Sequence, residues 1–200
     1  MPILNTNAFL SPAVAPRDEP GPMIRIRSAN RTRYPMKMAY ELSDSITINA
    51  SPAAVFTLLS DITRTGEWSA QCYRAHWNDA DDTHASYAPS HCIGSTFTGY
   101  NRTPEREWST TSEVITYKPN TEFSWQVLSS GTIWGYRMEP APNTNDATLL
   151  TEYTAFTPAG EAYFRSKFGP DATAQEAQRQ HAANAGITQT LTRIKEILEG

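Results

Sequence analysis

The sequence predicts an α+β domain in which helices cover one face of an antiparallel β-sheet. Three observations lead to this prediction. An alternating stretch at 40–48 runs into a helix signal, strand patterns and turn signals then recur up to about Phe156, and the C-terminal part has helical periodicity. A strand, a helix, many strands and a long helix in this order are typical of an α+β architecture.

Residues 1–38 are expected to form a largely disordered tail that precedes a domain at 39–200. The tail holds six of the fourteen prolines and shows no apolar periodicity. Its six Lys/Arg against two Asp/Glu give a net charge of +4, which leaves −8 on the rest of the chain. Such an acidic body argues against nucleic acid as the main partner.

Local signals define the first elements of the domain. The stretch YELSDSITI at 40–48 alternates as a strand does. Ser51 is a good N-cap and Pro52 suits the first helical position, so a helix is expected to begin there. Beyond Gly66 the stretch SAQCYRAHWND fits a strand, and residues 79–93 are polar and irregular.

Three turns then define the faces of a sheet. A four-residue loop at 103–106 puts Asn101 opposite Trp108, and register fixes both faces of that hairpin. The turns at 118–121 and 129–132 extend the same inner face, pairing Thr116 with Phe123 and Trp125 with Tyr136. The inner face is expected to carry Phe97, Asn101, Trp108, Thr110, Ser112, Val114, Thr116, Phe123, Trp125, Val127, Trp134, Tyr136 and Met138.

A last strand at 148–156 is expected to add Leu149, Thr151 and Tyr153 to the inner face. Glu152 is expected on the outer face, near Arg137. The register places no His, Asp, Glu or Lys on the inner rows, which argues against catalysis by proton transfer there. Helix-borne or loop-borne groups could still reach in, namely Glu67, His91, Arg165 and His181.

A helix from about 172 to 198, roughly 40 Å long, is expected to cover the sheet. Thr173 to Glu176 has capping-box spacing, and Ile187, Leu191 and Ile194 share one apolar stripe with Leu198. Asn184 lies within about 20° of Leu191 around the helix, so it is expected to face the sheet.

The inner face mixes aromatic rings with an amide and hydroxyls, as ligand pockets do. A fully packed core is disfavoured, because each buried polar group without a partner costs about 1–3 kcal/mol. Asn101 has two interpretations, a hydrogen-bonding group inside a cavity or a side chain that ties down the nearby turn.

No metal and no cofactor are expected. Two cysteines and three histidines invite a zinc interpretation, but their spacing matches no common site: Cys72, His76, His84, His91 and Cys92. Whether the two thiols are reduced or form a disulfide stays open.

Several blocks of the chain resemble a known family. SDITRTGEWSAQCYRAHW, GSTFTGYNRTPEREWSTTSEV, PNTEFSWQV, TLLTEY and AANAGITQTLTRIKEILE look like blocks of actinobacterial SRPBCC (START-like) proteins of the polyketide cyclase/dehydrase family. The resemblance covers about residues 40–199. It implies a helix-grip fold, in which a curved antiparallel sheet wraps around the C-terminal helix and leaves a deep apolar cavity. Members of the family range from lipid carriers to aromatic polyketide cyclases, so the resemblance does not fix an activity.

The leading hypothesis is therefore the binding of a hydrophobic or aromatic small molecule, lipid-like or polyketide-like, between sheet and helix. The predicted ligand-binding residues are Phe97, Asn101, Trp108, Thr110, Ser112, Phe123, Trp125, Trp134, Tyr136, Tyr153 and Asn184. The alternatives are a polyketide aromatase or cyclase and a protein-interaction module such as a toxin partner. No apolar run approaches the roughly 18 residues of a membrane span and no signal-peptide pattern occurs, so a cytoplasmic protein is expected.

Overall fold

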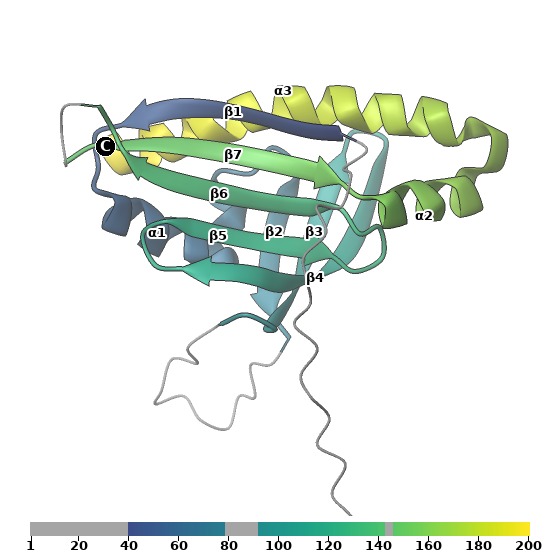
Figure 1. Ribbon diagram of the computed structural model, residues 1–200, viewed down its shortest axis with the longest axis horizontal. Helices are drawn as coiled ribbons and strands as arrows, with labels where there is room; N and C mark the ends of the chain where they lie inside the picture. The colour runs from purple at the N-terminus through teal and green to yellow at the C-terminus, as the bar shows by residue number, and fades with distance from the viewer. Residues whose placement is uncertain (1–39, 79–91, 143–145) are drawn as a thin grey trace, which may run out of the picture. The chain divides into compact units, whose positions relative to one another are not determined.

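Residues 40–78, 92–142 and 146–200 are described in a computed structural model, and they contain one antiparallel sheet with helices against one of its faces (Figure 1). The expected tail at 1–38 and most of the irregular segment at 79–93 lie outside these residues. No helix within the described ranges is both long and apolar enough to span a membrane.

The sheet has seven strands in the order β1-β7-β6-β5-β4-β3-β2, all paired antiparallel in the described residues. The strands are β1 (Tyr40–Ile48), β2 (Cys72–Trp77), β3 (Thr96–Thr103), β4 (Arg106–Lys118), β5 (Glu122–Val127), β6 (Ile133–Pro140) and β7 (Thr148–Phe156). The helical segments are α1 (Pro52–Ser60), η1 (Ile62–Glu67), α2 (Pro158–Phe168), η2 (Gly169–Asp171) and α3 (Ala172–Glu199).

Helix α1 begins as the sequence predicts. The Ser51 side chain accepts a hydrogen bond from the Ala54 backbone N–H at 3.3 Å, and Pro52 occupies the first turn. Val55 and Leu59 are buried on the side of the helix that faces the core. The short helix η1 follows directly and ends next to Trp68, whose side chain is only 1% exposed.

Helix α3 runs along β1 and β7 (Figure 1). Its predicted stripe is confirmed by the burial of Ile187, Leu191 and Ile194. The Thr188 hydroxyl donates to Asp44 Oδ2 at 3.1 Å, and Lys195 Nζ donates to the Thr47 carbonyl at 2.7 Å. These two bonds hold the helix along the length of β1.

Two details of the C-terminal part differ from the prediction. Helix α3 begins at Ala172, and its N-terminus carries no side-chain cap, so the capping box at Thr173 is wrong. Helix α2 was not predicted. It begins where Thr157 Oγ1 accepts from the Gly160 backbone N–H at 3.2 Å, with Pro158 in its first turn.

The β3–β4 hairpin has the predicted register throughout, from Arg102 opposite Glu107 to Thr96 opposite Glu113. Beyond it, the pairing of β4 with β5 shifts between Val114 and Thr116. A bulge of this kind inserts one residue and turns the following side chains to the other face. Tyr117 therefore lies opposite Phe123, and the prediction that Thr116 lies there is wrong.

The pairing of β5 with β6 is displaced by two residues from the prediction. Trp125 lies opposite Trp134 and Phe123 lies opposite Tyr136. The Val127 N–H donates to the Thr132 carbonyl at 2.9 Å, so the loop starts one residue earlier than expected, with Gly131 at a φ of +66°. Because the displacement is even, the same side chains stay on the inner face.

Strand β7 has the opposite orientation to the one predicted. Glu152 lies opposite Tyr136 and Leu150 lies opposite Met138, so both belong to the inner face. Tyr153 lies opposite Gly135 on the outer face, and the prediction that Tyr153 faces inward with Leu149 and Thr151 is wrong.

The outer face has room for the Tyr153 ring because Gly135 has no side chain. A Cβ at Gly135 would lie 2.6 Å from the Tyr153 hydroxyl and 2.6 Å from Ser124 Cβ. The Tyr153 hydroxyl donates to Glu122 Oε1 at 3.0 Å, and the Arg137 guanidinium lies 4.0 Å above the ring. These contacts stabilise the reversed orientation of β7.

Candidate functional site

Aromatic rings predicted for the inner face form a continuous chain of contacts. Ring centroids are 6.0 Å apart for Phe97 and Trp125, 5.7 Å for Phe123 and Trp125, and 5.8 Å for Trp125 and Tyr136. Tyr117 extends the chain to Phe123 at 6.0 Å and to Phe56 of α1 at 5.2 Å. The structure thus brings together most of the predicted aromatic residues and adds Tyr117.

The predicted lining residues fall into two groups by exposure. The centre of the inner face, defined here by Phe97, Ser112, Phe123 and Tyr136, is buried against neighbouring side chains. Phe123 is 0% exposed and Ser112 is 1% exposed, so the described residues fill this region. The open part of the inner face consists of the partly exposed residues Asn101, Trp108, Thr110, Trp125 and Trp134.

Asn101 makes local contacts in the open part. Its Nδ2 donates to the Gly99 carbonyl at 3.3 Å and to Thr110 Oγ1 at 3.4 Å. Across the ladder Asn101 lies opposite Cys72 of β2. The amide therefore holds together two neighbouring strands, and its contacts do not reach the turn at 103–106.

Trp108 of the open part contacts a cation, and the two remaining predicted lining residues, Tyr153 and Asn184, lie away from the inner face. Trp108 lies beneath the Arg106 guanidinium, 4.4 Å from its ring centre. Asn184 is exposed on α3, and Tyr153 lies on the outer face.

The ionisable side chains of helices and loops that were expected to reach the inner face are not found there in the described residues. Glu67 pairs with Arg64 at 2.6 Å, Arg165 pairs with Glu161 at 3.5 Å, and His181 is exposed. His91 lies outside the described residues.

A buried acid on the inner face was missed by the sequence reasoning. Glu152 is 5% exposed, and its Oε2 has no hydrogen-bond partner in the described part of the chain. Burial raises the pKa of this carboxyl well above its usual range, which favours its protonated, uncharged form. The expectation that the inner rows hold no ionisable acid is therefore wrong.

Tyr136 lies opposite Glu152 in the sheet, and Trp68 lies near Tyr136. The pKa of Tyr136 is raised well above its usual value, first by burial and next by the charge of Glu152. The indole N–H of Trp68 is a nearby donor that lowers the pKa of Tyr136. It does not form a hydrogen bond with the phenol, and Trp68 Nε1 has no partner among the described residues. An indole donor and a carboxyl oxygen, each without a partner among the described residues, thus both lie near the Tyr136 phenol.

The curvature of the sheet brings Cys72 into the same region. Cys72 belongs to the last strand of the sheet, yet its charge also raises the pKa of Tyr136 of β6. Burial raises the pKa of the Cys72 thiol itself. Cys72 and Cys92 are both free thiols, which answers the question that the sequence left open.

The polar groups of the inner face are suited to bind an uncharged polar atom. A protonated carboxyl donates one hydrogen bond and accepts others, while a phenol and an indole donate. The described ranges contain no group of three or more His, Cys, Asp or Glu side chains that could hold a metal ion. The site is thus able to pair with a hydroxyl or carbonyl oxygen in apolar surroundings.

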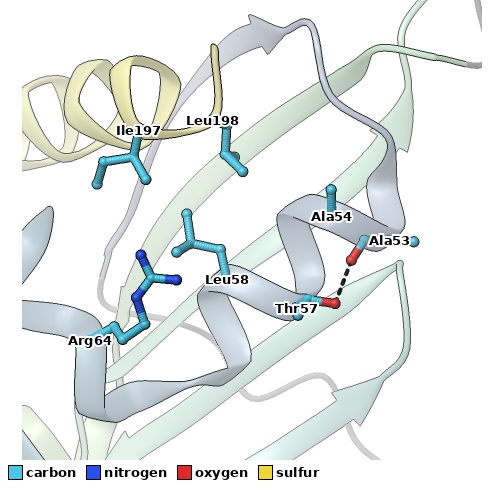
Figure 2. A pocket seen from close by; sticks show the side chains of 7 residues that line it. All are labelled: Ala53, Ala54, Thr57, Leu58, Arg64, Ile197 and Leu198. Carbon is cyan, nitrogen blue, oxygen red and sulfur yellow. Dashed lines mark hydrogen bonds between the residues drawn. The ribbon is translucent and has the colours of Figure 1, made fainter. Parts of the chain in front are cut away.

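Two surface hollows are lined by described residues, and neither contains a predicted ligand-binding residue. The larger, about 470 Å³, lies between α1 and the end of α3, where Leu58 faces Ile197 and Leu198 and Arg64 lies at the rim (Figure 2). The smaller, about 230 Å³, is lined by residues next to β2, by Arg102 of β3 and by Gln189 and Arg193 of α3.

Comparison with known proteins agrees with this architecture. The sequence model of a family described as "Polyketide cyclase / dehydrase and lipid transport" matches residues 39–199. A polyketide-cyclase-like protein from Corynebacterium glutamicum is 42% identical, with a TM-score of 0.56, over 80% of this chain and 91% of that chain. A search of curated proteins gives no match.

More distant solved structures share the fold alone. The di-domain ARO/CYC StfQ of the steffimycin biosynthetic pathway is 14% identical, with a TM-score of 0.57, over 80% of this chain and 50% of that chain. This chain thus spans about half of that protein. The protein TTHA0849 from Thermus thermophilus is 8% identical, with a TM-score of 0.57, over 78% of this chain and 95% of that chain.

Proposed function

The chain belongs to the polyketide cyclase/dehydrase and lipid transport family, an SRPBCC-type (START-like) family, and we propose that it binds a hydrophobic or aromatic small molecule on the inner face of its sheet. Its fold is the expected α+β helix-grip fold, a curved antiparallel sheet with a long C-terminal helix. The proposal adds to the family description the place of binding and the groups that contact the ligand.

One observation carries the proposal, namely the buried Glu152 Oε2, which has no partner among the described residues and lies across from Tyr136 of the aromatic core. A buried polar atom without a partner costs about 1–3 kcal/mol, and such atoms in folded proteins call for a reason. A ligand hydroxyl or carbonyl next to Glu152 Oε2 would supply the missing partner. Trp68 Nε1, near Tyr136, is also buried without a partner among the described residues.

The route to this carboxyl leads through the open part of the inner face. Trp125 and Trp134 are partly exposed and lie opposite each other on β5 and β6, and Trp125 contacts the buried Tyr136. Helix α3 contacts β1 and β7 most extensively, at the other side of the sheet. Because side chains fill the centre, a ligand must displace some of them as it moves inward from the two tryptophans.

Binding of a matched pair of probes tests the proposal. We expect 1-naphthol, which has a hydroxyl, to bind more tightly than naphthalene by roughly tenfold, a difference of about 1.4 kcal/mol. In a Glu152→Met variant this preference should disappear, because the new side chain has similar length and makes no hydrogen bond. Quenching of tryptophan fluorescence measures both affinities.

Tyr136→Phe and Tyr153→Phe form a matched control for the same titration. Both remove a hydroxyl from a buried tyrosine, but Tyr136 lies on the inner face and Tyr153 on the outer face. Only Tyr136→Phe should weaken 1-naphthol binding. Equal affinity of the wild-type protein for the two probes, or equal effects of the two tyrosine variants, would contradict the proposal.

A second candidate function, acid–base catalysis on a poly-β-ketone, is favoured by the same carboxyl. A protonated Glu152 could give its proton to a substrate carbonyl oxygen, and the resulting carboxylate could take a proton from the neighbouring carbon. The substrate then becomes an enol and the carboxyl is regenerated, with Tyr136 donating a hydrogen bond to the same oxygen.

Turnover separates catalysis from binding. Positioned acids contribute roughly 10²- to 10⁴-fold, so Glu152→Gln should lower kcat by about that factor while KM changes little. The glutamine keeps a hydrogen-bonding group at this position but carries no transferable proton. Unchanged kcat in Glu152→Gln, or no turnover in the wild-type protein, would leave binding as the function.

A further inference from the structure

The smaller of the two surface hollows is lined by polar and cationic side chains. It holds about 230 Å³ between β2, β3 and α3. Its polar lining consists of Ser69, Gln71, Tyr73, Arg102, Gln189 and Arg193. No carboxylate belongs to this lining, although the whole chain carries a net charge of −4.

Neither arginine is neutralised by an acid. Within the described residues Arg102 and Arg193 form no ion pair, a property that they share with several other arginines, whereas Arg64, Arg137 and Arg165 are paired. Glu107 lies opposite Arg102 in the β3–β4 ladder but is not within ion-pair distance. Two guanidinium groups that share one hollow without an acid favour binding of an anion between them.

Local structure holds the hollow in shape. The Arg102 guanidinium lies 4.9 Å from the centre of the Tyr73 ring. The backbone N–H of Arg102 donates to the Gln71 carbonyl at 3.0 Å. A Cβ at Gly66 would collide with the Tyr73 carbonyl oxygen, so η1 approaches β2 closely only because residue 66 is glycine. Glu67, the next residue, is bound by Arg64 through two hydrogen bonds of 2.7 and 2.6 Å. The nearest carboxylate along η1 is thereby already paired.

From this geometry we propose that the hollow binds a phosphate or carboxylate group between Arg102 and Arg193. The guanidinium groups supply charge-assisted hydrogen bonds, and the amides of Gln71 and Gln189 supply neutral donors. This site does not depend on the proposed function. It lies close to the inner face, however, because Gln71 and Tyr73 flank Cys72 along the chain.

The anion has two possible sources, a free small anion or the charged end of an apolar ligand. Titration with inorganic phosphate tests the shared chemistry, with backbone amide NMR signals of Gln71, Tyr73, Arg102 and Gln189 as the readout. Saturable shifts at these residues are expected in the wild-type protein. The double variant Arg102→Gln/Arg193→Gln should bind roughly tenfold more weakly or not at all.

The variant Arg165→Gln/Lys167→Gln is the matched control, because it removes the same charge from exposed positions on α2. It should bind phosphate as the wild-type protein does. Phosphate binding that is weakened equally in both double variants would overturn the site, because it would show that only long-range charge attraction acts. NMR shifts spread over exposed basic residues throughout the protein would overturn it for the same reason.

Octyl phosphate, used below its micelle-forming concentration, distinguishes the two sources. Tighter binding than inorganic phosphate, with shifts of the Trp125 and Trp134 indole signals, identifies the charged end of an apolar ligand. Equal binding of the two phosphates identifies a free anion. Either result supports the site if the binding is lost in the Arg102→Gln/Arg193→Gln variant. Failure of 1-naphthol to bind would overturn only the inner-face proposal.

Discussion

At the scale of single residues, the buried carboxyl of Glu152 makes the stability of the fold depend on pH. Its folded pKa is raised, so between the unfolded and the folded pKa the folded state binds more protons than the unfolded state. The free energy of unfolding therefore falls as the pH rises from about 4.3, the usual pKa of a glutamate, towards the folded pKa. Below that window the carboxyl is neutral in both states and this loss is absent.

Glu152→Gln should remove this dependence. At about pH 4 the free energy of unfolding of the variant should be close to that of the wild-type protein. Towards pH 7 the variant should become more stable than the wild-type protein, by up to about 1.4 kcal/mol of unfolding free energy per pH unit. Urea unfolding across this pH range measures the difference. Glu105→Gln, in the exposed β3–β4 turn, is the control, and a gain independent of pH in Glu152→Gln would refute the buried acid.

Gly135 is the residue that allows Tyr153 to lie on the outer face. Gly135→Ala places a Cβ 2.6 Å from Ser124 Cβ and from the Tyr153 ring, and should lower the free energy of unfolding by about 1–3 kcal/mol. Gly186→Ala in α3 is the control, because its Cβ meets nothing closer than Ala70 Cβ at 3.9 Å. That helical change should stabilise by about 0.5–1 kcal/mol. Thermal unfolding of both variants gives the comparison.

At the scale of elements, the bulge in β4 decides which side chain packs against α1. Tyr117→Ala removes the ring between Phe56 and Phe123 and should cost about 2–3 kcal/mol of unfolding free energy. Thr116→Ala, at the adjacent position, should cost less than about 1 kcal/mol. Urea denaturation measures the loss of unfolding free energy in both variants. A larger loss for Thr116→Ala than for Tyr117→Ala would contradict the bulge and support the regular register that the sequence predicted.

The register of the β3–β4 hairpin could be predicted from the sequence, whereas the orientation of β7 could not. The predicted register of β3 and β4 is confirmed residue by residue, although Thr103 and Arg106 pair within the strands and the turn between them has only two residues, 104–105. Strand β7 follows a longer connection that sets no register. Its two faces also look alike in sequence, because Leu149 and Tyr153 are as apolar as Leu150 and Thr154. The absence of a side chain at Gly135 gives the Tyr153 ring room on the outer face and so favours the observed orientation.

At the scale of the whole molecule, the candidate site depends on the curvature of the sheet. Cys72 of the edge strand β2 and Tyr136 of β6 are far apart in the strand order, yet Cys72 lies close enough to contribute to the raised pKa of Tyr136. The aromatic lining could be read from the alternation of single strands. The carboxyl could not, since the face on which Glu152 lies depends on how β7 joins the sheet.

The most direct test of the account is a crystal structure of the protein with 1-naphthol. The account predicts that the naphthol oxygen lies within hydrogen-bond distance of Glu152 Oε2, with the rings against Trp125 and Tyr136 on the inner face. Naphthol in the hollow between α1 and the end of α3, with Glu152 bonded only to an ordered water, would contradict it.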